Sequence, residues 1–326
     1  EFSKFNMYRG PDYYGRKTGD LGILKYGISH HRLSIIDLNE SANQPMVCND
    51  WEIVFNGEIY NYKELKNSLI NAGVEFSTNS DTEVILKLLE NFPIKEALSQ
   101  LNGMFAIGLI NKKTYEVIVA RDRWGKKPIY YYHNQNHFSF SSDFRSFSKL
   151  EKKFTLNKKG IKYYFCELSF PQPETIFNEI SQVKPGCYIV YKNGKLIQSQ
   201  YIDLFKNEKE DTIIKNNFSS PAEAVKGLLS DAIKTRLEAD VPVGSFLSGG
   251  IDSGIIVALS AKYTQNLNTY TVGFDNTEFD ERPYANILAK KYKTNHHELL
   301  LKSNDIDIEK LIMEFGEPFA DSSMIP

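Results

Sequence analysis

Apolar and polar positions follow two different rhythms along the 326 residues, and the change falls near residue 220. In the first part, short apolar runs of strand length predominate. Residues 51–56 alternate between apolar and polar side chains, which is typical of a strand with one buried face. Further strands are predicted at residues 104–110, 116–120, 129–132 and 137–141. Many short strands with few helices between them predict an α+β domain of stacked antiparallel sheets.

Two helices are predicted within this first part. Residues 62–72 place Leu65, Leu69 and Ile70 on one helical face, and Gly73 supplies the stop. The second helix is predicted to begin at Asp81, a residue type that favours the N-cap position, and to bury the apolar residues 84, 85, 88 and 89.

The region from residue 151 to residue 220 is predicted to hold the remaining strands and a linker. Residues 188–200 form a candidate hairpin that turns on Asn193 and Gly194, a pair that favours the tight turn between antiparallel strands. The polar and charged stretch 206–220 is the best linker candidate.

From residue 221 onward, predicted strands and helices alternate. The strands are expected at residues 243–247, 269–274 and 297–301, and the helices at residues 253–262, 282–292 and 306–315. This alternation builds right-handed βαβ units and predicts an α/β domain with a doubly wound parallel sheet. In such sheets ligands bind beyond the carboxyl ends of the strands.

Composition narrows the classes of function. A net charge of −2 and a pI near 6.4 argue against a nucleic-acid-binding domain, which is usually basic. Cys48, Cys166 and Cys187 form no zinc-binding pattern, and sparse cysteines are typical of a reducing compartment, so a cytoplasmic protein is expected. No apolar run reaches the ~18 residues that a membrane span needs, and the first residues do not resemble a signal peptide.

A glycine-rich segment follows the first strand of the second domain: Leu247-Ser248-Gly249-Gly250-Ile251-Asp252-Ser253. Its glycines let backbone N–H groups turn toward an anion, and the following helix adds a positive dipole end. Asp252 would repel phosphate unless a cation bridges the two, so Mg²⁺ is predicted at Asp252. The alternative is an ordinary turn with Asp252 as a helix cap. A Walker A loop is excluded, because Gly250 stands where that loop needs lysine.

This segment resembles the SGGxDS signature of ATP pyrophosphatases, and residues 240–246 (DVPVGSF) resemble the lead-in of asparagine synthetases. Residues 271–274, 279–281 and 296–298 fit the same pattern, although each alone is typical of an ordinary strand or helix end. The resemblance implies that Val272 and Gly273 border the adenine and that Asp252 binds Mg²⁺. It assigns ATP binding to Leu247, Ser248, Gly249, Gly250, Asp252, Ser253, Val272 and Gly273.

Five fragments of the first part resemble the class II glutamine amidotransferase domain in order and spacing: RGPD (9–12), HRLSIID (31–37), NGEIYN (56–61), SDTEV (80–84) and ARDRWGKKP (120–128). The residue types suit a free amino acid. An arginine fork binds its carboxylate, an aspartate binds its ammonium group, and an amide with a backbone N–H stabilises the oxyanion of amide hydrolysis. The resemblance implies a fold like that of N-terminal nucleophile hydrolases.

The resemblance places Arg32 on the glutamine carboxylate, Asp81 on the ammonium group, and Asn56 with Gly57 in the oxyanion hole. The implied glutamine-binding set is Arg32, Ile36, Asn56, Gly57, Glu58 and Asp81. Taken one at a time, Arg32 also fits a surface position, Asp81 a helix cap, and Asn56-Gly57 a turn.

Two features depart from the family pattern. The family nucleophile is an N-terminal cysteine whose own amine serves as base, whereas residue 1 here is glutamate and the three cysteines match no such motif. The chain also stops at residues 321–326 (DSSMIP), before the family's second acidic motif. We therefore expect a sequence truncated at both ends, with no glutamine hydrolysis by the family mechanism from these residues alone.

As a whole, the resemblance implies an asparagine synthetase-type amidotransferase, an ATP-dependent carbon–nitrogen ligase with glutaminase residues 1–150 and synthetase residues 221–326. Ammonia released from glutamine would pass internally to a carboxylate that ATP has activated as an acyl-adenylate, giving an amide, AMP and pyrophosphate. Aspartate is the default acceptor, and another carboxylate such as a sugar acid in surface-polysaccharide synthesis is the alternative. A paralogue without the nucleophile and a standalone nucleotide-binding module are the competing classes. A homodimer is one assembly that the resemblance allows.

Overall fold

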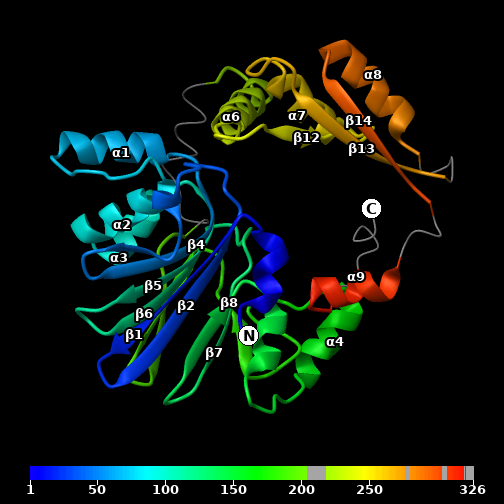
Figure 1. Cartoon of the computed structure of the whole chain (residues 1–326). Helices are drawn as coiled ribbons and strands as arrows, with labels where there is room; N and C mark the ends of the chain where they lie inside the picture. The colour runs from blue at the N-terminus through cyan, green and yellow to red at the C-terminus, as the bar shows by residue number, and fades with distance from the viewer. Residues whose placement is uncertain (204–217, 276–279, 303–306, 319, 321–326) are drawn as a thin grey trace. The chain divides into compact units, whose positions relative to one another are not determined.

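A computed structural model of the chain describes residues 1–203, 218–275, 280–302, 307–318 and 320. The chain forms two compact units (Figure 1). The first contains Glu1–Phe205 together with Phe315–Asp321, and the second contains Lys206–Glu314 together with Ser322–Pro326.

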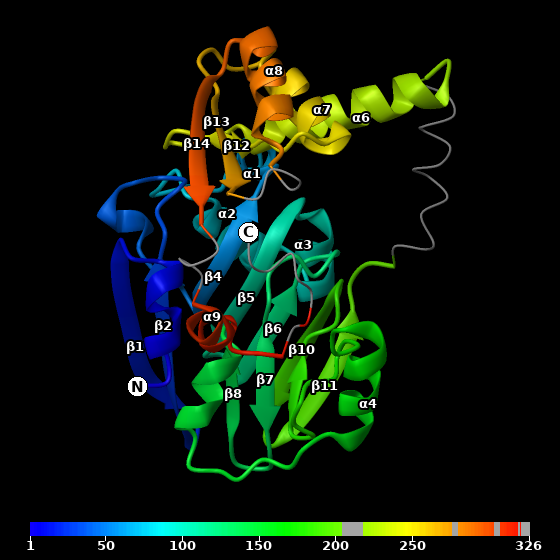
Figure 2. The ribbon, with the colours of Figure 1, turned by 90° about the vertical axis from the view of Figure 1, so that its right-hand side faces the viewer.

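The first unit is built on a six-stranded sheet in the order β11-β10-β6-β5-β4-β3, with every neighbouring pair antiparallel. Figure 2 shows β4, β5 and β6 running side by side through this sheet. The strands are β3 (Met46–Cys48), β4 (Trp51–Ile59), β5 (Gly103–Asn111), β6 (Glu116–Arg121), β10 (Cys187–Lys192) and β11 (Lys195–Gln200).

A second set of antiparallel strands packs on one face of this sheet. It consists of a three-stranded sheet in the order β8-β7-β9 and of the hairpin β1-β2. Ala106 and Val119 of the large sheet share a buried cluster with Ile129 and, at its edge, Phe138 and Phe140. The strands are β1 (Tyr13–Leu21), β2 (Leu24–Arg32), β7 (Tyr130–His133), β8 (Phe138–Ser141) and β9 (Ile180–Gln182).

Helices cover the other face of the large sheet. Ile53 and Ile107 of that sheet belong to one buried cluster with Val84 and Leu88 of α2. The predicted α+β fold with stacked antiparallel sheets is therefore confirmed. The helices of this unit are α1 (Tyr62–Asn71), α2 (Asp81–Asn91), α3 (Ile94–Gln100) and α4 (Lys158–Glu167), with 3-10 turns η1 (Lys4–Arg9), η2 (Glu40–Ala42) and η3 (Phe144–Lys149).

Several local predictions can be compared with the first unit. The hairpin turn at Asn193-Gly194 is confirmed, and both residues have the positive φ, 49° and 76°, that this tight turn requires. The strand predicted at 51–56 is too short, because β4 continues through Gly57 to Ile59. The N-cap of α2 is Ser80, whose side chain accepts a hydrogen bond from the Thr82 N–H, so Asp81 is the first helical residue. Ile70 is exposed rather than part of the buried face.

The second unit contains a parallel sheet in the order β12-β13-β14. Leu247, Val257 and Ala285 belong to the cluster that packs α7 and α8 on the strands. The predicted alternation of strand and helix is confirmed, whereas α6 was not predicted, and most of the proposed linker lies outside the described residues. The elements are α6 (Pro221–Arg236), β12 (Gly244–Phe246), α7 (Ile251–Ser260), β13 (Asn268–Phe274), α8 (Arg282–Tyr292), β14 (Asn295–Leu301) and α9 (Ile308–Phe315). Among the helices of the described residues, none has both the length and the apolar character needed to cross a bilayer.

Candidate functional site

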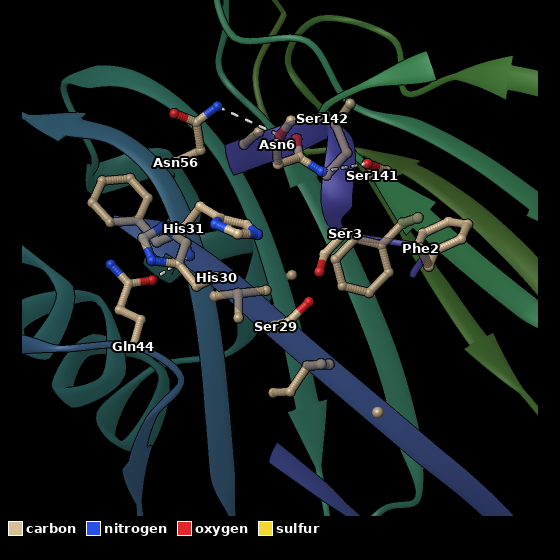
Figure 3. Close-up of a pocket in the computed structure, with 18 of the residues that line it drawn as sticks. Phe2, Ser3, Asn6, Ser29, His30, His31, Gln44, Asn56, Ser141 and Ser142 are labelled. Atoms are coloured by element: carbon tan, nitrogen blue, oxygen red, sulfur yellow. Dashed lines mark hydrogen bonds between the residues drawn. The ribbon is translucent and has the colours of Figure 1, made fainter. Parts of the chain in front are cut away.

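A cavity of about 840 Å³ lies within the first unit, lined mainly by residues of β2, β4 and β8 and by the start of α2. Figure 3 shows part of its lining, with Asn56, His30, His31 and Gln44 around the same space. The structure brings all of the residues that the sequence assigned to glutamine to this cavity: Arg32, Ile36, Asn56, Gly57, Glu58 and Asp81.

Arg32 is the last residue of β2 and is only 5% exposed, so it is not a surface residue of a strand edge. The loop that follows β2 wraps around its guanidinium group. Nη1 donates to the Asn43 side-chain oxygen at 2.9 Å and to the Asn39 carbonyl at 3.2 Å. Nη2 donates to the Ile36 carbonyl at 3.1 Å and to the Asp37 carbonyl. These four acceptors are neutral, so the contacts fix the position of the positive charge without cancelling it.

Asp81 lies at the start of α2, buried beside the same cavity. Its Oδ2 accepts a hydrogen bond from the Ile59 N–H at 3.0 Å. Burial raises the pKa of Asp81 to about 7, and the negative charge of Glu58 acts in the same direction. The charge of Arg32 is within electrostatic reach of Asp81. A cation placed against Asp81 would favour its ionised form, because an opposite charge stabilises a carboxylate.

Asn56 and Gly57 lie inside strand β4, so they do not form a turn. The Asn56 amide donates to the Ser142 hydroxyl at 3.4 Å, a long contact that leaves the amide at the cavity surface. Gly57 has a φ of 155°, and a Cβ there would lie 2.0 Å from the Met104 carbonyl oxygen on the neighbouring strand. Only glycine fits this backbone without strain, because it has no Cβ. The Asn56 side-chain amide and the Gly57 backbone therefore both line the cavity.

Other residues of the cavity were not singled out from the sequence. His30 and His31 precede Arg32 on β2, and the buried atoms His30 Nδ1 and His31 Nε2 have no hydrogen-bond partner within the described residues. Burial lowers the pKa of His30 to about 4, so its imidazole is neutral near pH 7. Gln44 holds the site together, since its side-chain oxygen accepts the Phe55 N–H at 2.6 Å and its amide donates to the Thr82 hydroxyl at 3.2 Å. His31 opens the fragment that contains Arg32 and His30 precedes it, so this proximity in the sequence was the available signal for both histidines.

The cysteines lie away from this cavity. Cys48, Cys166 and Cys187 are all within the described part of the chain, and none of them lines the cavity. Burial raises the pKa of Cys48 and of Cys187, which disfavours their thiolate forms. A thiolate is the nucleophilic form of cysteine. These residues therefore do not supply an activated nucleophile to the cavity.

The glycine-rich segment of the second unit joins β12 to α7. The Ser248 and Ser253 hydroxyls lie 2.8 Å apart, and the Ser248 hydroxyl also accepts the Gly250 N–H at 3.2 Å. Gly250 is the N-cap of α7. The Gly249 N–H donates to a carboxylate oxygen of Glu281 at 3.2 Å, so an anionic group already sits against this segment.

Val272 and Gly273 are placed beside the same segment by strand register. Phe246, the last residue of β12, pairs with Tyr270, so the next residues of β13 extend past the end of β12. The Leu247 N–H donates to the Tyr270 carbonyl at 2.8 Å, and the Thr271 hydroxyl donates to the Leu247 carbonyl. The predicted nucleotide residues thus meet at the carboxyl edge of the parallel sheet, where ligands bind in such folds.

Asp252 is exposed at the second position of α7. In the described residues there is no group of three or more histidine, cysteine or acidic side chains that could hold a metal ion. Asp252 can supply one carboxylate ligand, which fits Mg²⁺ bound mainly through phosphate oxygens and water.

Comparison with known proteins adds two family matches. A glutamine amidotransferase domain matches residues 3–202, and an asparagine synthase domain matches residues 224–326. A Methanocaldococcus jannaschii protein, provisionally named as a glutamine-hydrolysing asparagine synthetase, is 34% identical over all of this chain and 67% of its own length. Asparagine synthetase (glutamine-hydrolysing) 1 of Bacillus subtilis is 32% identical, again over all of this chain, which spans 51% of that protein. Among solved structures, the Bacillus subtilis glutamine phosphoribosylpyrophosphate amidotransferase has a TM-score of 0.47 at 16% identity, covering 91% of this chain and 61% of that one.

These matches define a glutamine amidotransferase domain joined to an asparagine synthase domain. The chain belongs to the glutamine-hydrolysing asparagine synthetase family, as its sequence motifs predicted.

Proposed function

We propose that the cavity of the first unit binds glutamine for amide hydrolysis. The carrying observation is the convergence of Arg32, Asp81 and the Asn56-Gly57 pair, from different elements, on one cavity. A buried guanidinium suits the α-carboxylate, and a buried carboxylate suits the α-ammonium group. Asn56 and Gly57 would then stabilise the oxyanion that forms at the side-chain amide. The nucleophile would be the N-terminal cysteine of the complete protein.

We infer a complementary role for the second unit, namely activation of a carboxylate by ATP. The loop from Leu247 to Ser253 offers N–H groups and the positive end of α7 to phosphate. Bound Mg²⁺, held in part by Asp252, would neutralise phosphate charge during activation. Ammonia from the first unit would attack the activated carboxylate, giving an amide, AMP and pyrophosphate.

Aspartate as the acceptor and a cytoplasmic location are part of this proposal. A different acceptor is the second candidate, because family relatives carry other names. A Gibberella zeae protein named amidase chry2 is 32% identical over 95% of this chain and 47% of its own length. Product formation with aspartate and with other carboxylates, in the presence of ATP and ammonium, distinguishes the two candidates.

Two variants of a complete protein that begins with the family's nucleophilic cysteine test the proposal. Each variant should lose one activity and keep another. Arg32→Ala should weaken glutamine-dependent synthesis by about 2–5 kcal/mol, the range for removing one partner of a buried charge pair. Synthesis from free ammonium should persist in this variant, because that route bypasses the cavity. Asp252→Ala should abolish synthesis from both nitrogen donors and leave glutaminase activity largely intact.

Matched controls are available on both units. Arg16 and Asp231 are exposed and do not line the cavity or the glycine-rich segment, so their alanine variants should behave like the parent protein. Normal glutamine-dependent synthesis in Arg32→Ala would show that the cavity assignment is wrong. Equal loss of glutaminase and synthesis in Asp252→Ala would contradict separate sites.

A further inference from the structure

The first turn of α8 contacts both of the segments to which ATP was assigned. Glu281, the residue before the helix, accepts a hydrogen bond from the Gly249 N–H at 3.2 Å. Tyr284 packs on the same glycine, since a Cβ at Gly249 would lie 2.8 Å from the Tyr284 Cβ. Arg282, the first residue of the helix, lies against Gly273 of β13 instead. One short stretch of α8 therefore touches the side assigned to phosphate and the side assigned to adenine.

Arg282 covers the surface of Gly273 that faces α8. A Cβ added at Gly273 would lie 2.9 Å from Cγ of Arg282 and closer still to its Nε, so the arginine side chain occupies the place of a side chain on the strand. About a quarter of the Arg282 side chain remains exposed, with 27% relative accessibility, so a ligand can reach it. A ligand bound beside Gly273 on this face of β13 meets Arg282.

Acidic side chains fix the Arg282 guanidinium and offset its charge. Nε donates to Oδ1 of Asp280 and Nη2 donates to Oδ2, both at 2.8 Å. The Arg282 backbone N–H also donates to Oδ1 of Asp280 at 3.2 Å. Nη1 lies 3.9 Å from a carboxylate oxygen of Glu298 on β14. A two-pronged contact of this kind fixes the plane of the guanidinium as well as its position.

A guanidinium held in this way suits a nucleotide base better than a phosphate. Arginine binds phosphate through its fork of N–H groups, and Asp280 already accepts from Nε and Nη2 of that fork. The flat faces of the group are a separate binding surface, because a guanidinium stacks on aromatic rings. Adenine offers such a ring, whereas the phosphate chain does not.

We propose that Arg282 is a base-contacting residue of the ATP site, and that its guanidinium, fixed by Asp280 over Gly273, stacks on the adenine ring. The proposal rests on the binding of ATP by the second unit. It separates two contacts within one turn of α8, in which Glu281 lies on the phosphate side and Arg282 on the base side.

Calorimetric titration of the complete protein with ATP and with inorganic triphosphate, both in the presence of Mg²⁺, tests this assignment. Arg282→Ala should weaken ATP binding about tenfold, an amount typical of one base-stacking contact. Binding of triphosphate should stay at the parent level, because this ligand has no base. Arg282→Lys keeps the charge but loses the plane and the fork, so it should weaken ATP binding nearly as much. Lys290→Ala removes an exposed charge of the same helix and should leave both ligands unaffected.

A substitution on β13 tests the same contact from the other side. Gly273→Ala places a methyl group where Arg282 lies, so it should displace the guanidinium and weaken ATP binding about as much as Arg282→Ala does. In the double variant the two losses should not add, because the displaced group is already absent. Losses that add fully would show that Gly273 acts without Arg282 and would overturn the proposal.

The remaining outcomes separate the base contact from the proposed function. Unchanged ATP binding in Arg282→Ala, equal weakening of ATP and triphosphate, or full ATP affinity in Arg282→Lys would each overturn the base contact and leave the ATP site in place. A parent protein that binds neither ATP nor triphosphate would instead overturn the proposed function of the second unit, and the base contact with it.

Discussion

Charged groups are buried in the cavity of the first unit, whereas they are exposed in the glycine-rich segment of the second unit. In the cavity, Arg32 and Asp81 are each 5% exposed and are fixed by backbone groups. In the segment, Ser248 and Asp252 are exposed, and the hydroxyls bond to each other and to neighbouring backbone. One site therefore holds its charged groups out of water, whereas the other holds hydroxyl groups and a carboxylate at the surface.

This difference indicates how each site would acquire a ligand. The burial that raises the pKa of Asp81 also strengthens its attraction to a bound cation, because low polarity amplifies both effects. In the segment, an incoming phosphate must instead displace internal hydrogen bonds and the Glu281 carboxylate from Gly249. The cavity is prearranged for its ligand, and the segment has to exchange partners.

The largest expected effect tests how rigidly the cavity is built. Gly57→Ala should destabilise the first unit by about 3 kcal/mol or more, because the added Cβ meets the Met104 carbonyl in a backbone conformation that disfavours any side chain. Gly73 is the matched control: it also has a positive φ, 88°, but a Cβ at this position would have no atom within 4 Å, so Gly73→Ala should cost about 1 kcal/mol. Denaturant unfolding of both variants measures the difference. Equal losses would show that close packing at Gly57 does not matter.

A second prediction concerns pH and the charge of Asp81. With a pKa of about 7 in the free protein, Asp81 is protonated below pH 7 and must lose its proton to pair with the glutamine ammonium group. Glutamine affinity should therefore fall by about tenfold per pH unit below pH 7 and level off above it. His30, with a pKa of about 4, does not titrate in this range.

Calorimetric titration with glutamine between pH 5.5 and 8 measures this dependence. Asp81→Asn is the control, since it should bind more weakly and with little change across the same range. A flat profile for the parent protein would mean that Asp81 stays ionised or does not contact the ligand.

The smallest expected effect sharpens the description of the glycine-rich segment. Glu281→Gln removes a negative charge next to the Gly249 N–H, so ATP should bind about three- to tenfold more tightly, an amount typical of one partly screened charge. Asp231→Asn, which removes an exposed charge on α6, is the matched control and should have no effect. Weaker ATP binding in Glu281→Gln would instead assign the carboxylate a direct role in holding the nucleotide or its metal.

Some elements could be predicted because local chemistry decides them. Asn193 and Gly194 tolerate positive φ, so the hairpin turn follows from two residues, and the alternating strands and helices of the second unit follow from their apolar patterns. The helices α3, α4 and α6 were missed, and α3 is only seven residues long. Gly160 is the one buried residue of α4, and α6 buries little besides Ala224 and Ile233, so neither helix has a strong apolar stripe to read.

In the candidate cavity, too, some features follow from the local sequence and others only from tertiary contacts. The sequence motifs named its residues, yet the assignment of Asn56-Gly57 to a turn was open because glycine is typical of turns. Pairing with β5 instead extends the strand across Gly57, since its neighbour's carbonyl fills the place of a side chain. That information lies in residues 103–111 and not in the motif.

The sequence by itself determined the chemical inventory of this protein: a guanidinium, a carboxylate and an amide in one half, and a glycine- and serine-rich segment before a helix in the other. Only the tertiary structure decided that Arg32 and Asp81 are buried beside one cavity and that the cysteines lie elsewhere. The physical reason is that residue type fixes which interactions a group can make. Its charge state and strength depend on burial and on neighbours that are distant in the chain.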